Sequence, residues 1–276
     1  MNIVLEPFTY DFFGRALAAA VLIGAVTGAL GPFVMVRRMA YIGQGLSQSV
    51  LGGVGVGLVL GAGLYVGAAA ATIVAALAIH VTRRRGIPAD TAIGIVAATM
   101  FAAGVAAISA NRDRSLNISN LLFGNILGVN QGDLILVAVV VVVTALLLGA
   151  NYKQLLATTH NPAVAAAHGV RTGMMELLFN LLLALAVVTA LQVLGVLLVA
   201  ATLLLPAATA SLVFGSFGRL TVASIVIGVA SAVIGLYVSY YRDVSSGPAI
   251  VLTGAVVFAV VALGLSNRYR HAERRP

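Results

Sequence analysis

Long apolar stretches alternate with short polar segments along the chain. Nine stretches are long enough to cross a hydrocarbon core of about 30 Å, and they cover 13–36, 42–62, 64–82, 90–110, 133–150, 174–193, 195–214, 220–241 and 248–266. The second and third stretches are joined only by GAGLYVG, and the sixth and seventh by LQVLG, so either pair can form one broken or tightly turned unit. The pattern predicts an all-α polytopic membrane helical bundle of eight to nine transmembrane helices, with residues 1–276 as a single transmembrane domain.

Composition supports a multi-pass protein of the cell membrane. Hydrophobic residues make up 61% of the chain and charged residues only 9%, whereas a soluble domain has about 25% charged residues. Cysteine is absent, which excludes disulfides, thiolate metal sites and cysteine nucleophiles. The net charge of +8 does not indicate a nucleic-acid partner, because the basic residues cluster at the ends of apolar stretches and no basic soluble segment exists.

The distribution of positive charge predicts the orientation. With nine helices, twelve of the 16 basic residues fall on one side: Arg37, Arg38, Arg83, Arg84, Arg85, Lys153, Arg171, Arg219, Arg268, Arg270, Arg274 and Arg275. Basic residues accumulate on the cytoplasmic side of membrane proteins. We therefore expect a cytoplasmic C-terminus and an external N-terminus, and eight helices would move the N-terminus to the other side.

The apolar stretches contain few residues that could act as catalytic groups. Glu176 stands at an expected cytoplasmic helix start, where the helix dipole favours an acid. His80 is near a helix end, and no histidines share metal-ligand spacing within a stretch. The serines have no base beside them in the sequence. We expect no enzymatic activity in this chain.

Uncharged polar residues within the apolar stretches are better candidates for a functional role, above all those in YIGQGLSQSV (41–50). A helix brings residues four apart to one face, so Gln44 and Gln48 project together with Ser47 close by. Polar side chains inside a membrane either line a pathway or join helices through hydrogen bonds. The segment alone leaves both roles open.

Six segments occur in an order that is typical of one family: RRMAYIGQGLSQSVLGGVGVG (37–57), PADTAIGI (88–95), LNISNLLFGNILGV (116–129), NPAVAAAHGV (161–170), LQVLGVLLVAATLLLPAATA (191–210) and SYYRDVSSGPAIVL (239–252). The first resembles the pattern RRM-A-x-x-G-D-A-L-S-H-A, and the second resembles E-D-x-A-I-G-I. Together they resemble the permease subunits of ATP-binding-cassette importers for zinc, manganese and iron, over nearly the whole chain.

This resemblance implies a type II importer-like fold and a set of partners. The chain would pair with a second copy of the permease, with cytoplasmic ATPase subunits and with an extracytoplasmic metal-binding protein, in contact with membrane lipid. It would bind no cofactor, since the ATP is used by the partner subunit. Manganese or zinc would be the cargo, and Gln44, Ser47 and Gln48 would lie on the translocation path.

The resemblance also places the ATPase-coupling helix at Asn161, Pro162, Ala165 and Gly169. The residues suit a short helix, because Asn161 is a good N-cap, proline is favoured at the first helical position and Gly169 is a good terminator. Asn161 and Ala163 stand where relatives have acids, which implies an adjusted ATPase partner.

The chain departs from the family at the aspartate and histidine that are candidate metal ligands, because both positions are glutamine, Gln44 and Gln48. An amide oxygen can coordinate Mn²⁺ but is a poor ligand for Zn²⁺. Metal transit is then weaker, shifted toward manganese, or governed by other residues. Two alternatives stay open: the same architecture carrying an uncharged or chelated solute, or an ion-coupled secondary transporter.

Overall fold

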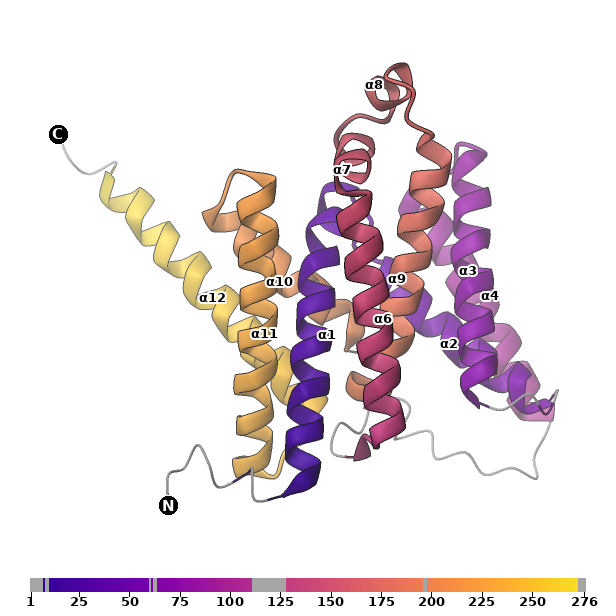
Figure 1. The fold of residues 1–276 in the computed structure, drawn as a ribbon, viewed down its shortest axis with the longest axis horizontal. Coiled ribbons are helices and arrows are strands. Elements are labelled where there is room, and N and C mark those ends of the chain that lie inside the picture. The colour runs from indigo at the N-terminus through magenta and orange to yellow at the C-terminus, as the bar shows by residue number, and fades with distance from the viewer. Residues whose placement is uncertain are drawn as a thin grey trace.

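The computed structural model describes residues 7, 10–59, 61, 64–110, 128–195 and 198–272. Within these ranges all extended regular elements are α-helices (Figure 1). The long helices are α1 (Asp11–Val36), α2 (Ile42–Val59), α3 (Leu64–Arg84), α4 (Ala89–Ala110), α6 (Gln131–Ala150), α9 (Thr172–Leu194), α10 (Val199–Val213), α11 (Phe217–Arg242) and α12 (Ser246–Ala272). Two short helices, α7 (Tyr152–His160) and α8 (Pro162–Ala167), lie between α6 and α9.

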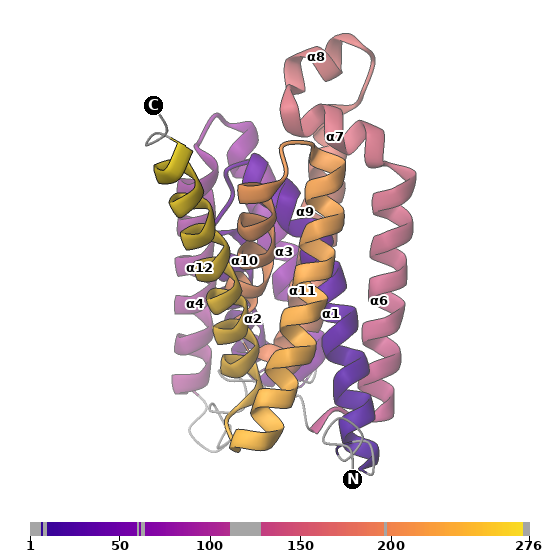
Figure 2. The same cartoon turned by 90° about the vertical axis from the view of Figure 1, so that its left-hand side faces the viewer.

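Each of the nine apolar stretches forms one helix, which confirms the predicted helical membrane bundle. Within the described residues, seven helices are long and apolar enough to cross a membrane, and α10, with 15 residues, is apolar but shorter. In Figure 2 α1 begins at the lower end of the bundle and α12 ends at the upper end. This arrangement fits nine crossings. Pro206 lies inside α10 without ending it.

Glycine allows two helix pairs to approach closely. A Cβ atom at Gly28 of α1 would lie 2.7 Å from the carbonyl oxygen of Ser224 in α11, and one at Gly104 of α4 would lie 2.4 Å from the Cα atom of Gly52 in α2. Small residues at such crossings bring backbones together, which is the usual means of helix association in a membrane. The two contacts tie α1 to α11 and α2 to α4.

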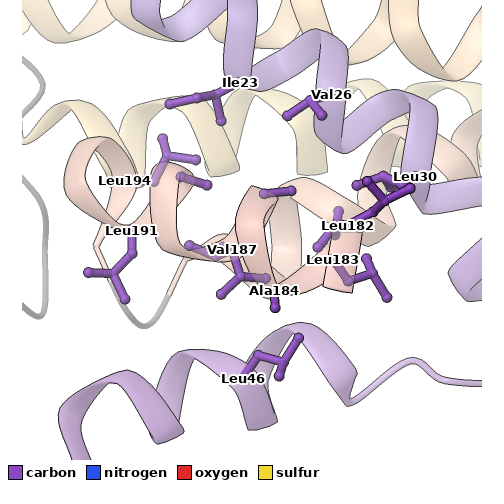
Figure 3. Close-up of a cluster of buried hydrophobic side chains, with 14 of the residues drawn as sticks. Ile23, Val26, Leu30, Leu46, Leu182, Leu183, Ala184, Val187, Leu191 and Leu194 are labelled. Carbon is purple, nitrogen blue, oxygen red and sulfur yellow. The ribbon is translucent and has the colours of Figure 1, made fainter. Parts of the chain in front are cut away.

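The apolar core runs along α9. Figure 3 shows Leu182, Leu183 and Val187 of α9 between Ile23 of α1 and Leu46 of α2, and all five side chains are almost fully buried. The outer helices are different, because their large apolar side chains point away from the bundle; Leu146 of α6 and Val260 of α12, for example, are 66% and 65% exposed. In a membrane protein these faces contact lipid.

The helices α7 and α8 stand above the bundle in Figure 1, at the end where α1 and α3 finish. This end carries Arg37, Arg38 and Arg83–Arg85, so the positive-inside bias makes it cytoplasmic. The helix α8 packs against α7 and α9. The chain thus presents a short helical projection toward the cytoplasm.

Candidate functional site

A groove at the cytoplasmic ends of α2 and α4 contains both glutamines of the YIGQGLSQSV segment. It has a volume of about 520 Å³ and is open to the outside of the single chain. Its lining includes Gln44 and Gln48 from the first two turns of α2, with Asp90 from the first turn of α4. Two amides and a carboxylate therefore border one space.

Close packing of α2 against α4 holds this groove together. A Cβ atom at Gly45 would lie 2.5 Å from a methyl carbon of Ile93, so the absence of a side chain at Gly45 lets α4 come near. Gln44 itself is exposed and Gln48 is half-buried. The two side chains can reach a solute in the groove, and their role in transport stays a prediction.

Ser47 is placed differently from the two glutamines. It has no exposed surface, it is not part of the groove lining, and its hydroxyl has no hydrogen-bond partner in the part of the chain that the structure describes. The helical spacing of residues 44, 47 and 48 suggested one shared face. The structure brings only the glutamines to the groove, because the helix turns Ser47 toward the interior.

Asp90 is the groove residue that sequence reasoning did not single out. The signal was available in PADTAIGI, where an acid stands at a helix start. An acid in that position is normally explained by the helix dipole alone. Only the packing of α4 on α2 shows that its carboxylate shares a groove with the two amides. Among the described residues, no group of three or more His, Cys, Asp or Glu side chains is placed to hold a metal ion.

The segment 161–169 folds as its sequence predicts. The Asn161 side-chain oxygen accepts a hydrogen bond from the Val164 backbone N–H at 3.2 Å, and Pro162 occupies the first turn of α8. Gly169 has a φ of 79°, a left-handed conformation that glycine adopts without strain. Ala165 is buried, whereas its helical neighbours are exposed. The predicted contact of this segment with an ATPase stays a prediction.

A charged cluster lies where the end of α3 packs against the start of α9. Arg83 at the end of α3 forms an ion pair with Glu176 of α9 at 2.5 Å, and His80 lies 4.0 Å from the same carboxylate. Arg37, just after α1, places its guanidinium carbon 4.2 Å from the ring centre of Phe179. Glu176 is therefore an ion-pair partner across two helices, and the helix dipole alone does not account for it.

Comparisons with known proteins place the chain in a transport family. Residues 9–264 match the family described as ABC 3 transport family. The manganese transport system membrane protein MntC of Listeria monocytogenes is 36% identical over 92% of this chain and 91% of its own length. The chelated iron transport system membrane protein YfeC of Yersinia pestis is 34% identical over 94% of this chain and 88% of its own length.

Solved structures agree with this result. A chain of PsaBC from Streptococcus pneumoniae, solved in complex with Fab, is 34% identical and superposes with a TM-score of 0.82 over 94% of both chains. A chain of a metal-chelate type ABC transporter in an inward-facing conformation has a TM-score of 0.70 at 17% identity, which shows a shared fold. From its sequence match, its full-length relatives and its fold, the chain belongs to the ABC 3 transport family.

Proposed function

We propose that the chain is the permease subunit of an ATP-driven importer whose cargo is Mn²⁺. The observation that carries the choice of metal is the groove with Gln44, Gln48 and Asp90. Its donors are all oxygen atoms, if the amides turn their carbonyl groups inward. Oxygen ligands suit a hard ion such as Mn²⁺, whereas Zn²⁺ prefers imidazole and thiolate. The relatives named for manganese transport support the same choice.

The groove is open in the single chain, so we propose that a second copy of the permease closes it. Pairing would bring two sets of these three side chains together and would supply two carboxylates for a divalent ion. An extracytoplasmic binding protein would deliver the ion at the opposite end. Uncharged amides next to one acid per chain hold the ion weakly, which suits passage rather than storage.

We further propose that α8 contacts a cytoplasmic ATPase subunit. It lies at the cytoplasmic end, its outer face is exposed, and its cap fixes its start at Asn161. ATP binding and hydrolysis would occur in that partner, and this chain would perform no catalysis. The chain would convert movement of α8 into opening and closing of the bundle.

A second cargo class has one specific observation in its favour. The chain has neutral amides where the family pattern has an aspartate and a histidine, and one relative is named for chelated iron. A chelate brings its own ligands and needs fewer from the protein. Such a cargo would make Asp90 dispensable.

Uptake measurements separate these two functions. Cells with and without the gene would be given radioactive Mn²⁺, Zn²⁺ and Fe²⁺, each as the free ion and as a chelate. We expect gene-dependent uptake of free Mn²⁺, and we expect Asp90→Asn to reduce it at unchanged membrane abundance. Uptake confined to the chelates, and unaffected by Asp90→Asn, would refute the Mn²⁺ proposal and support the alternative.

A further inference from the structure

Arg37 connects the end of α1 to the side of α7. Its Nε atom donates a hydrogen bond to the Thr159 hydroxyl oxygen at 2.9 Å, and its Nη2 atom donates to the Thr158 hydroxyl oxygen at 3.3 Å. The partners are 122 and 121 residues away in the sequence. One guanidinium group thus binds two neighbouring hydroxyls of the cytoplasmic segment.

The two hydroxyls are oriented to receive these bonds. Thr159 donates its own hydrogen to the Leu155 carbonyl at 2.6 Å, and Thr158 donates to the Gln154 carbonyl at 2.9 Å. Each oxygen therefore keeps its lone pairs for Arg37, which can only donate. The contact matches donor to acceptor at both positions.

The guanidinium also contacts α9. It lies over the Phe179 ring, at a distance typical of a cation–π contact. Burial lowers the pKa of Arg37 to about 10, although nearby Glu176 opposes this shift. The group therefore remains protonated at neutral pH. Arg37 joins three elements: α1 through its backbone, α7 through hydrogen bonds, and α9 through the ring.

The helix α8 has few packing contacts with the membrane helices. Within the described part of the chain, its main packing is on α7, with a smaller contact on α9. The helix α7 is held at both ends by aromatic contacts, since Tyr152 and His160 each approach the Phe217 ring of α11. Its polar attachment to α1 is through Arg37.

We propose that Arg37 is a positioning residue that transmits displacement of the α7–α8 segment to α1 and α9. The inference rests on the proposed function in one respect, that an ATPase moves α8. A pull on α8 turns α7, and the two hydroxyls carry the guanidinium with them. Because that guanidinium also rests on Phe179, α1 and α9 move together with α7.

Arginine is the side chain that this role requires. A planar guanidinium can donate two hydrogen bonds in one plane while stacking on a ring, whereas a lysine ammonium is a point charge that cannot do both. The charge alone is therefore not sufficient. Arg37→Lys keeps the charge and loses the geometry, so it separates the two effects.

The test measures metal ions transported per ATP hydrolysed by the purified permease–ATPase complex in proteoliposomes, with Mn²⁺ as the ion. We expect Arg37→Gln and Arg37→Lys to lower this ratio about tenfold, the size of effect that a lost charged hydrogen bond produces. The ATPase rate should fall much less. Arg38→Gly is the matched control, because Arg38 is the adjacent charge, is exposed, and has a φ of 53° that glycine accepts readily.

A second variant keeps the test decisive if Arg37 substitutions fold poorly. Thr158→Val with Thr159→Val preserves side-chain shape and removes only the hydroxyl acceptors, and it should lower the ratio as well. An unchanged ratio in these variants, or an equal fall in Arg38→Gly, overturns the role of Arg37. Failure of the proposed function is recognisable separately, since the wild-type complex would then show no ATP-dependent uptake of Mn²⁺.

Discussion

Three adjacent residues at the end of α1 have three different environments. Arg37 binds α7, Arg38 is exposed in a left-handed conformation, and Met39 is fully buried. The Met39 sulfur accepts a hydrogen bond from Arg83 at 3.5 Å, which connects this turn to the Glu176 ion pair. Reversal of the chain at Arg38 is what allows the residues on either side of it to point inward.

The glutamines of the groove lead to a prediction at the same scale. Gln44→Asp combined with Gln48→His places a carboxylate and an imidazole beside Asp90, and imidazole favours Zn²⁺ over Mn²⁺ relative to two amides. We expect the ratio of zinc to manganese uptake to rise by about tenfold, equivalent to roughly 1.4 kcal/mol. Competitive uptake at matched membrane abundance measures it.

Gln154→Asp is a suitable control for that double variant. Gln154 is exposed on α7, away from the groove, so a carboxylate there should leave the preference for metals unchanged. A well-expressed double variant with the wild-type preference would show that Gln44 and Gln48 do not select the cargo.

At the scale of helices, the close glycine contact between α1 and α11 makes the stability of the bundle sensitive to added side-chain volume. Gly28→Ala introduces a Cβ atom 2.7 Å from a backbone oxygen of α11, so one helix must shift. Overpacking of this kind costs about 1–3 kcal/mol. We expect a clear fall in the midpoint of thermal unfolding in detergent.

Gly14 on the same helix provides the comparison. Among the described residues, a Cβ atom there would meet nothing within 4 Å, and alanine is the better helix former. Gly14→Ala should leave the midpoint unchanged or raise it. Equal destabilisation by both substitutions would mean that the close approach at Gly28 is unimportant.

The helix α8 depends on its cap. Asn161→Ala removes the bond to the Val164 N–H, and loss of such a cap costs about 1 kcal/mol. Because α8 has only six residues, we expect its start to fray and ATP-dependent uptake to fall, with membrane insertion unchanged.

Asn161→Asp serves as the control for the cap, because aspartate is an equally good N-cap. It should retain most of the uptake. If Asn161→Ala transports at the wild-type rate in cells with equal amounts of protein, the coupling role assigned to α8 is wrong.

For the whole molecule, the nine crossings predict which loops face the cytoplasm. Ser216 lies between α10 and α11 on the cytoplasmic side, and Ser245 lies between α11 and α12 on the opposite side; both are exposed. The native chain has no cysteine, so single Ser→Cys variants need no further substitution. In intact cells a membrane-impermeant maleimide should label Ser245→Cys but label Ser216→Cys only after permeabilisation. The reverse pattern would contradict the orientation.

The sequence predicts local features of this protein well. Each apolar stretch corresponds to a helix because length and hydropathy alone determine it. The cap at Asn161 and the stop at Gly169 are also local, since each depends on residues no more than a few positions away. Charge placement also predicts an orientation, which stays a prediction.

Features that join distant segments were not predictable in this way. The residues next to Arg37 in the sequence do not indicate its hydrogen bond to Thr159, which is 122 residues away. The positive-inside rule already explained the positive charge of Arg37. An acid at a helix start, such as Asp90, likewise does not indicate a groove, because only the packing of α4 on α2 brings it beside the glutamines. Helical spacing groups Ser47 with the two glutamines, but it defines a helix face only approximately. The packing of α2 against α9 and the neighbouring helices decides which side chains are buried.

The projection of α8 beyond the bundle has a consequence for evolution. Of its six residues only Ala165 is buried, so substitutions on the remaining surface disturb no apolar packing. If α8 contacts an ATPase as proposed, selection can reshape this surface to suit a different motor subunit while leaving the groove of Gln44, Gln48 and Asp90 untouched. A duplicated gene of this kind could acquire a new energy-supplying partner through changes in a single turn and a half of helix.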